Sequence, residues 1–344
     1  DRLPALRKAG RHSLGRAHGS AILRFDMNFL VLRMIARRVG IGLVTLFIVC
    51  ALVFFMSSLL PGDAAQMALG QAATPETVAA LRKQLGLDEP AVLRFFIWVG
   101  NLVTGDFGIS YAGGIPVRDI VMPRIPNSLM LAAAATATSV PIALVLGVVC
   151  AMYRGTRLDR TIGVVTMSVV AVPEFLVATL AVLVFAVKLH WMSALSLGAD
   201  TSTVAGFFKA YGLPVLTLCC VVVAQMARMT RAALINQLDA PYVEMAVLKG
   251  LRPTRIVLRH AIPNAVGPIV NAMALSLSYL LGGVVIVETI FSYPGLASTL
   301  VDAVSNRDLP VVQFCVLFFS ACYLLLLLIA DICTIVFNPR LRSS

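Results

Sequence analysis

Six long apolar stretches constrain this chain more than any other feature of its sequence. Each can cross the roughly 30 Å hydrocarbon core of a bilayer as a helix, which takes about 20 residues. Each is apolar around its whole circumference, which excludes amphipathic helices on a soluble core. The predicted spans are 40–60, 129–152, 162–187, 213–230, 265–287 and 311–336. The sequence therefore predicts an all-α polytopic membrane protein with six transmembrane helices.

The composition agrees with a bilayer as the solvent. The chain is 59% hydrophobic and 13% charged, whereas a soluble domain carries about 25% charged residues. The net charge of +11 does not indicate nucleic acid, because the basic residues flank the apolar runs instead of following one soluble face. The seven cysteines fall in apolar segments without metal-ligand spacing, so we expect packing residues and no metal site.

The basic residues also predict an orientation. The first 40 residues, the loops 153–161 and 228–264 and the carboxyl end hold 20 of the 28 Lys and Arg residues. The opposite loops (61–128, 188–212 and 288–310) hold the other 8. Because Lys and Arg gather in cytoplasmic loops, both termini are predicted to be cytoplasmic.

These boundaries divide the chain into five predicted regions. A basic cytoplasmic segment (residues 1–39) precedes the first helix, 40–60, and its first 26 residues suggest either a disordered tail or an upstream-start artefact. An extracytoplasmic insertion (61–128) follows, and then a five-helix core (129–337) with the loop 228–264. A short cytoplasmic tail, 338–344, ends the chain.

The loop 228–264 contains the start and stop signals of two short helices. Pro241 can begin a helix that Gly250 ends, and Pro253 can begin a second one that Pro263 closes. Gly250 is expected to need either a positive φ or a close approach to a partner. Glu244 lies near the start of the first helix, where the helix dipole favours an anion. The residues alone leave two interpretations open, a solvated cytoplasmic hairpin or a docking element for a soluble partner.

At this point the sequence resembles a known family. The order Glu244-Met245-Ala246, then Gly250, then Pro263 is similar to the EAA loop of binding-protein-dependent ABC importer permeases. The chain departs from that pattern at Met245, His260 and Ile262, and the form around His260 is similar to the dipeptide/oligopeptide branch. Further stretches that resemble this branch are 59–63, 105–110, 287–296, 306–310 and 338–340. The resemblance covers residues 30–342 and is to the first, B-type, permease subunit.

The resemblance implies a function and partners. The chain would be one half of a pore completed by a second homologous permease subunit, with two cytoplasmic ATPase subunits and an extracytoplasmic substrate-binding protein, in the bacterial inner membrane. It would take up dipeptides, oligopeptides or similar small solutes by alternating access. No cofactor is expected in this chain, since ATP and Mg would bind the ATPases. The ATPase-coupling residues would be Glu244, Met245, Ala246, Lys249, Gly250, Arg252 and Pro263.

Two other classes of protein are alternatives to an importer. The sequence lacks a Gly-x-x-x-x-Gly-Lys-Ser/Thr phosphate loop, and its four histidines form no zinc or Ser/His site, so we expect no catalytic residue and no enzyme. An ATP-independent channel or secondary transporter is the first alternative, and an intramembrane enzyme is less favoured. A transporter of its own would need ion-coupling groups at mid-membrane, and Glu174 is the clearest candidate.

Polar residues inside the spans are candidates for a translocation pathway. Glu174 follows Pro173 in the middle of the third span, and an ionisable residue there is expensive unless it serves a function. A neutral Glu174 bonded to a carbonyl freed by a Pro173 kink is an equal alternative. The fifth span offers Asn271, Ser278 and Tyr279, which also suit interhelical hydrogen bonds. Structural roles are favoured for Glu288 and Asp331.

Overall fold

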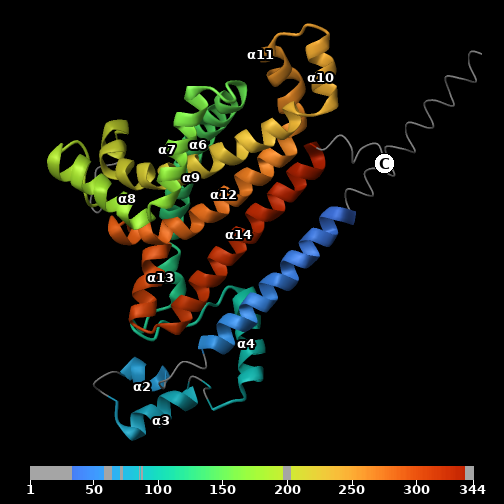
Figure 1. The fold of residues 1–344 in the computed structure, drawn as a ribbon. Coiled ribbons are helices and arrows are strands. Elements are labelled where there is room, and N and C mark those ends of the chain that lie inside the picture. Colours follow the sequence, from blue (N-terminus) through green and yellow to red (C-terminus); the bar gives the residue numbers. More distant parts are fainter. Residues whose placement is uncertain are drawn as a thin grey trace, which may run out of the picture.

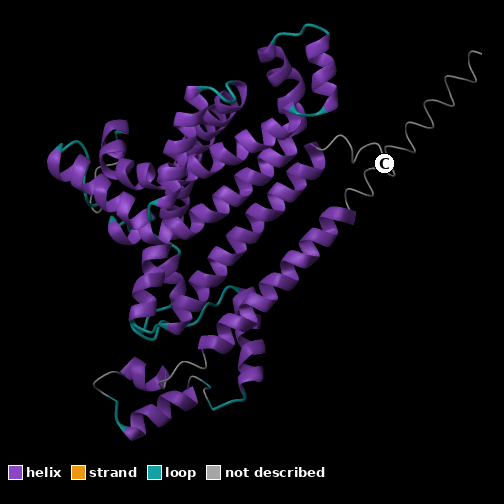
Figure 2. Cartoon of the chain, in the orientation of Figure 1, coloured by secondary structure: helices purple, strands orange, loops and turns teal. Residues whose placement is uncertain are grey.

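The structure, a computed structural model, describes residues 33–57, 64–69, 73–84, 86, 88–196 and 203–337. Within these residues every regular element is a helix, and one isolated antiparallel bridge joins Ile109 to Pro116 (Figure 2). The all-α prediction is therefore confirmed. Residues 1–32 of the predicted basic segment, the stretches 59–63 and 338–340 and the predicted tail 338–344 lie outside the described residues.

The elements follow one another along the chain as Figure 1 labels them. The first helix is Arg33–Ser57. The insertion contains α2 (Ala64–Leu69), α3 (Pro75–Gln84), α4 (Ala91–Thr104) and α5 (Val117–Val121). The core begins with α6 (Ile125–Met152), α7 (Arg157–Ala171), α8 (Glu174–Ala181), the π-helical η2 (Val182–Lys188) and α9 (Val204–Leu238). It ends with α10 (Pro241–Leu248), α11 (Pro253–Ile256), the π-helical η3 (Val257–Ala261), α12 (Ile262–Ile290), α13 (Leu296–Ser305) and α14 (Leu309–Phe337).

Five helical segments are long and apolar enough to cross a membrane by length and composition. Each begins before its predicted boundary, and the five are Arg33–Ser57, Val117–Met152, Gly206–Leu238, Pro253–Ile290 and Leu309–Thr334. The span Gly206–Leu238 has 33 residues, which makes it about 50 Å long at 1.5 Å per residue. Such a helix is longer than the roughly 30 Å hydrocarbon core of a bilayer. Arg228 and Arg231, assigned to a loop from the sequence, therefore belong to α9.

The third predicted span, 162–187, differs in the structure. Helices α7 and α8–η2 meet at an angle of 100°, as a broken span or a re-entrant loop, in place of one kinked helix. The cause is local, because a residue before proline is driven out of the helical region. Val172 is extended, with φ −84° and ψ 127°, and Pro173 then precedes α8. Helices α6 and α12 instead continue through Pro141 and Pro268.

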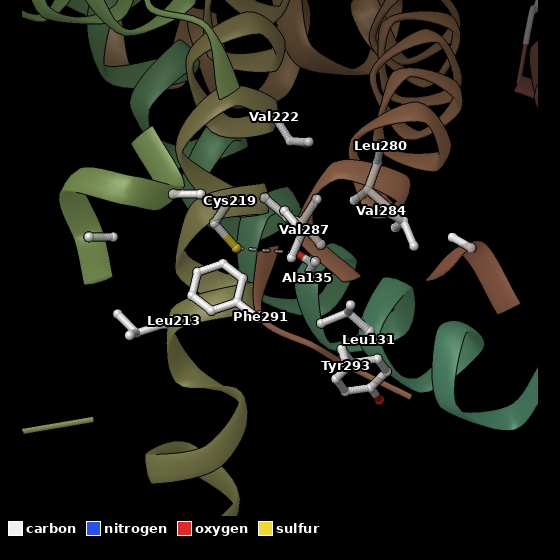
Figure 3. Packing of buried hydrophobic residues seen from close by; sticks show 14 residues of the cluster. Leu131, Ala135, Leu213, Cys219, Val222, Leu280, Val284, Val287, Phe291 and Tyr293 are labelled. Atoms are coloured by element: carbon white, nitrogen blue, oxygen red, sulfur yellow. Dashed lines mark hydrogen bonds between the residues drawn. The ribbon is translucent and has the colours of Figure 1, made fainter. Parts of the chain in front are cut away.

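Helix α9 lies at the centre of the fold and packs against α6, α7, α8 and α12. The largest buried cluster gathers side chains from α6, α8, α9 and α12 (Figure 3). Its buried members include Leu131, Leu213, Leu280 and Phe291. The thiol of Cys219 lies 3.5 Å from the Ala135 carbonyl in this cluster, so this cysteine packs as the sequence suggested.

The first helix lies at the edge of the molecule. It packs through Cys50 and Phe54 against Phe95 of α4 and Leu317 of α14. Most of its other apolar side chains are exposed, as expected for a helix that faces lipid. Near its start, Arg38 forms a 3.0 Å ion pair with Asp331 of α14. In Figure 1 the start of this helix, the end of α14, the α6–α7 turn and the α10–α11 hairpin lie in the upper part, whereas α2–α4 and α13 lie in the lower part.

Candidate functional site: the α10–α11 hairpin and the Glu174 pocket

Helices α10 and α11 form a hairpin that projects from the bundle (Figure 1). Gly250 lies between them with φ 75°, a left-handed conformation that satisfies the expectation from the sequence. Its N–H donates to the Val247 carbonyl at 2.8 Å, and the N–H of Leu251 donates to the Ala246 carbonyl at 3.3 Å. This pair of bonds is a Schellman motif, which satisfies the last carbonyls of α10 and fixes the direction of the chain.

The hairpin has one buried and one exposed apolar face. Val243 and Ala246 of α10 pack against Ile256 of α11 and form a small core. Other apolar side chains have no such cover, and Leu248 is the most open of them, at 74% exposed. The exposed apolar set is Tyr242, Met245, Val247, Leu248 and Leu258. A contiguous group of exposed apolar side chains on so short an element is typical of a surface that another molecule covers.

The residues predicted to couple to an ATPase divide between these faces. Ala246 is buried in the hairpin core, whereas Met245 lies on the exposed apolar face. The remaining predicted residues, Glu244, Lys249, Gly250, Arg252 and Pro263, are exposed. Pro263 lies in the first turn of α12, where proline is tolerated. Their role in coupling stays a prediction.

Ion pairs anchor the base of the hairpin to the rest of the chain. Arg154, in the α6–α7 turn, bonds both oxygens of Asp239 at 2.8 and 3.1 Å, just before α10 begins. Close by, Arg231 of α9 makes a bidentate pair with the buried Asp159 of α7, at 2.7 and 2.8 Å. Asp159 also accepts the N–H of Gly155 at 3.0 Å. These pairs connect the segment before α10 to the α6–α7 turn, and α9 to α7.

Glu174 lines a second feature, an open pocket of about 340 Å³ where the third span breaks. The polar side chains around it are Glu174 of α8, Gln225 and Arg228 of α9, and Tyr279 of α12. The Glu174 carboxylate makes no hydrogen bond with any residue that the structure describes. The carbonyl that Pro173 leaves without its helical donor is that of Val169, and it accepts the N–H of Val172 at 3.3 Å. The alternative in which Glu174 bonds a carbonyl freed by the Pro173 kink therefore finds no support.

The structure brings together only two of the four predicted pathway residues. Glu174 and Tyr279 share the pocket, although they are more than 100 residues apart in the sequence. Ser278 instead lines an apolar pocket between α12, α14 and the first helix, and its buried hydroxyl has no partner among the described residues. Asn271 is exposed on α12, two turns before Tyr279, and lines neither of these pockets.

Sequence reasoning missed Gln225 and Arg228 as members of the pocket. Arg228 was counted only as a cytoplasmic charge, and Gln225 carried no signal of its own. Their spacing of three residues does place them on one face of a helix. Both residues lie inside the predicted span 213–230, so the sequence did offer this common face, but it did not show that α8 and α12 pack beside it.

The two other ionisable span residues have structural partners. Glu288, fully buried at the end of α12, accepts the Ser128 hydroxyl at 2.5 Å and the N–H groups of Ala297 and Ser298 at 2.8 and 2.9 Å. These N–H groups begin α13, where a helix terminus favours an anion. Asp331 pairs with Arg38. Both arrangements agree with the structural roles expected from the sequence.

Two of the stretches that resemble the family meet in space. Ser110, at the end of the stretch 105–110, donates its hydroxyl to Asp308 of the stretch 306–310. The N–H of Tyr111 donates to the other Asp308 oxygen at 3.0 Å. Burial raises the pKa of the Tyr111 phenol above its usual value; Arg94 opposes this shift and Asp308 adds to it. The contact fastens the end of the insertion to the α13–α14 turn.

Comparison with known proteins identifies the family to which this chain belongs. Residues 143–343 match the family described as binding-protein-dependent transport system inner membrane component, and residues 31–132 match the family of its N-terminal part. The chain belongs to this family. Its relatives include the glutathione transport system permease protein GsiC of Escherichia coli (strain K12) and of Shigella flexneri serotype 5b (strain 8401). Each is 36% identical over 317 residues, covering 92% of this permease and 99% of the relative.

A solved structure shows the same fold. A chain from an inward-facing conformation of the MetNI methionine ABC transporter matches this permease with a TM-score of 0.52 and 17% identity. The match covers 64% of this permease and 96% of that chain. At this identity the likeness concerns the fold alone.

Together these findings settle the class of the protein. It is a permease subunit of an ABC importer in the peptide-type branch, with several spans in the inner membrane, and not an enzyme. An importer of this family works with ATPase and binding-protein partners. The alternatives of an ATP-independent transporter and an intramembrane enzyme are thereby set aside.

Proposed function

We propose that this permease is one half of a two-permease pore that imports peptide-like solutes by alternating access. Its α10–α11 hairpin would dock in an ATPase subunit on the cytoplasmic side. The observation that carries the proposal is the exposed apolar face of the hairpin, on an element whose own small core is already complete. A hairpin that was merely solvated would present polar groups there instead of Met245, Val247 and Leu248.

The hairpin is built to transmit a displacement. Its start is tied to the α6–α7 turn by the Arg154–Asp239 pair, and its end continues through η3 into α12. Since α12 packs on α9 and α14, a movement of the hairpin tilts the helices around the Glu174 pocket. Closure of the two ATPases upon ATP would in this way switch the pore between inward-open and outward-open states.

The orientation and the partners follow from the same proposal. The basic termini, the α6–α7 turn and the hairpin would face the cytoplasm, and the insertion α2–α5 would face a substrate-binding protein outside. A second homologous permease would complete the pore, and two ATPases would each hold one hairpin. A peptide-like solute is favoured because the GsiC relatives are named as glutathione permeases, and glutathione is a small peptide. Glu174 and Tyr279 would line the path that this solute follows.

A matched pair of substitutions tests the docking. Leu248→Ser removes the most exposed apolar side chain of the hairpin, and Val103→Ser removes a side chain that is 82% exposed at the end of α4, in the lower part of Figure 1. We expect Leu248→Ser to lose at least half of the ATPase that co-purifies with the permease. Val103→Ser should retain all of it at equal membrane abundance. Equal retention by both variants would show that the exposed face is not the docking surface.

A further inference from the structure

The pocket beside Glu174 joins one carboxylate, one guanidinium, one amide and one phenol. These groups come from α8, α9 and α12, which the chain brings together only in the folded state. None of the four side chains forms a hydrogen bond or ion pair with another residue in the described part of the chain. Opposite charges therefore line one concavity without neutralising each other through a direct contact.

The position of the pocket excludes lipid as the medium that satisfies these groups. Tyr279 is the eighteenth residue of the 29-residue α12, and Gln225 and Arg228 lie within the span Gly206–Leu238. Hydrocarbon offers no hydrogen-bond partner, so polar side chains at this depth face a water-filled cavity or a bound group. The pocket is half-enclosed, and its open side can admit water or a solute.

The carboxylate of Glu174 lies against α12 at the wall of this pocket. A Cβ atom built at Gly283 would overlap the carboxyl group of Glu174. Because Gly283 has no side chain, the carboxylate has room close to the backbone of α12. Glu174 thus lies near Tyr279, which is one helical turn before Gly283 on α12, and it has no basic partner among the described residues.

We propose that this pocket holds a dipolar solute during transport, with an ammonium group of the solute at Glu174 and a carboxylate at Arg228. This inference rests on the proposed function and adds Arg228 and Gln225 to the pathway as specificity-determining residues. Arginine suits a carboxylate because its planar fork donates two parallel bonds. The Gln225 amide and the Tyr279 hydroxyl provide uncharged partners for peptide groups between the two ends. A simple cation would be repelled by Arg228, which favours a solute that carries both charges.

The first test asks whether the pocket is wet, and it needs no knowledge of the solute. Single cysteines replace Tyr279 and Ile329 in a permease cleared of its native cysteines; these side chains are 54% and 48% exposed, and Ile329 lies on α14 outside the pocket. A charged methanethiosulfonate reagent is applied from both sides of membranes that contain the assembled importer. We expect Tyr279→Cys to react at least tenfold faster than Ile329→Cys. Equal, slow reaction from both sides overturns the proposal.

The second test separates a contact with the solute from a structural role. Uptake of glutathione and of L-alanyl-L-alanine is measured in the complete importer for Glu174→Gln, Arg228→Gln and the exposed control Arg157→Gln. Losing one charge-assisted bond should raise the KM for uptake about tenfold, with less change in the maximal rate. Glu174→Asp and Arg228→Lys should recover part of the loss, and Arg157→Gln should match the parent.

The outcomes of this test distinguish the two proposals. An unchanged KM in both charge-removing variants, with a parent that transports, overturns the pocket proposal and leaves the proposed function intact. A maximal rate that falls at constant KM, with less complex in the membrane, assigns both residues a structural role and also overturns it. If the parent transports neither probe although ATPases co-purify, the peptide assignment of the proposed function fails. The thiol comparison then decides the pocket by itself.

Discussion

Substitutions at Gly250 can distinguish the effect of the backbone conformation of the hairpin from the effect of its surface charge. The residue has φ 75°, and no atom lies within 4 Å of a Cβ built there, so a side chain meets backbone strain and no clash. The left-handed conformation costs an ordinary L-residue about 1–2 kcal/mol, and less for Asn and Asp. Gly250→Asn and Gly250→Asp therefore have nearly the same shape and strain, and they differ in one charge.

The two variants should behave differently if the hairpin docks in an ATPase. We expect Gly250→Asn to keep most transport, because its strain is below about 1 kcal/mol and the Schellman bonds can persist. Gly250→Asp should reduce ATPase co-purification at least tenfold, which corresponds to about 1.4 kcal/mol, because an unpaired charge would be buried against the partner. Gly250→Ala should fall between them, since alanine carries the larger strain without the charge.

The assay is co-purification of the ATPases from membranes with equal permease abundance, followed by solute uptake. Equal losses for the Asn and Asp variants would show that backbone conformation alone matters. Full activity of the Asp variant would refute the reasoning, because a docked surface cannot accept an unpaired charge next to Leu248 without loss.

Three further predictions concern stability and orientation. Glu288→Ala leaves one hydroxyl and two N–H groups unpaired in a buried site and should lower the free energy of unfolding by about 3–5 kcal/mol. Glu288→Gln keeps an acceptor and should lower it by about 1–2 kcal/mol. Thermal unfolding in detergent should show the larger loss for Glu288→Ala. Arg231→Ala removes one partner of a half-buried ion pair and should lower the melting temperature clearly. Arg154→Ala removes one partner of an exposed ion pair and should lower the free energy of unfolding by at most about 1 kcal/mol. Equal shifts in melting temperature would contradict the burial argument. An impermeant thiol reagent applied to intact cells should label a cysteine at the exposed Ile115 and not one at Thr254, and the reverse pattern would invert the proposed orientation.

The segment 241–263 shows which parts of the structure local sequence can predict. Pro241, Gly250 and Pro253 determine a helix, a left-handed stop and a second helix, because each acts through its own backbone preferences. The same holds for the long apolar runs, since a helix is the local structure that satisfies every backbone group in lipid. The family and the all-α class could therefore be predicted without tertiary information.

Helix ends and polar partners were decided by the tertiary structure. The break at Pro173 turned a predicted kink into a 100° bend, because hydropathy measures apolar length and contains no direction. Glu174, Arg228 and Tyr279 line one pocket through the packing of α8, α9 and α12, and no spacing in the sequence encodes that arrangement.

Glu174 and Glu288 make the same point together. Both are single acids in apolar surroundings and look alike in the sequence. The fold gives Glu288 the start of α13 and the Ser128 hydroxyl, whereas it leaves Glu174 without a partner among the described residues. The sequence by itself determined that this chain forms membrane-spanning helices with a hinged hairpin between two of them. Only the tertiary structure decided which buried charge is satisfied and which faces a pocket, because hydrogen bonds across helices depend on long-range packing.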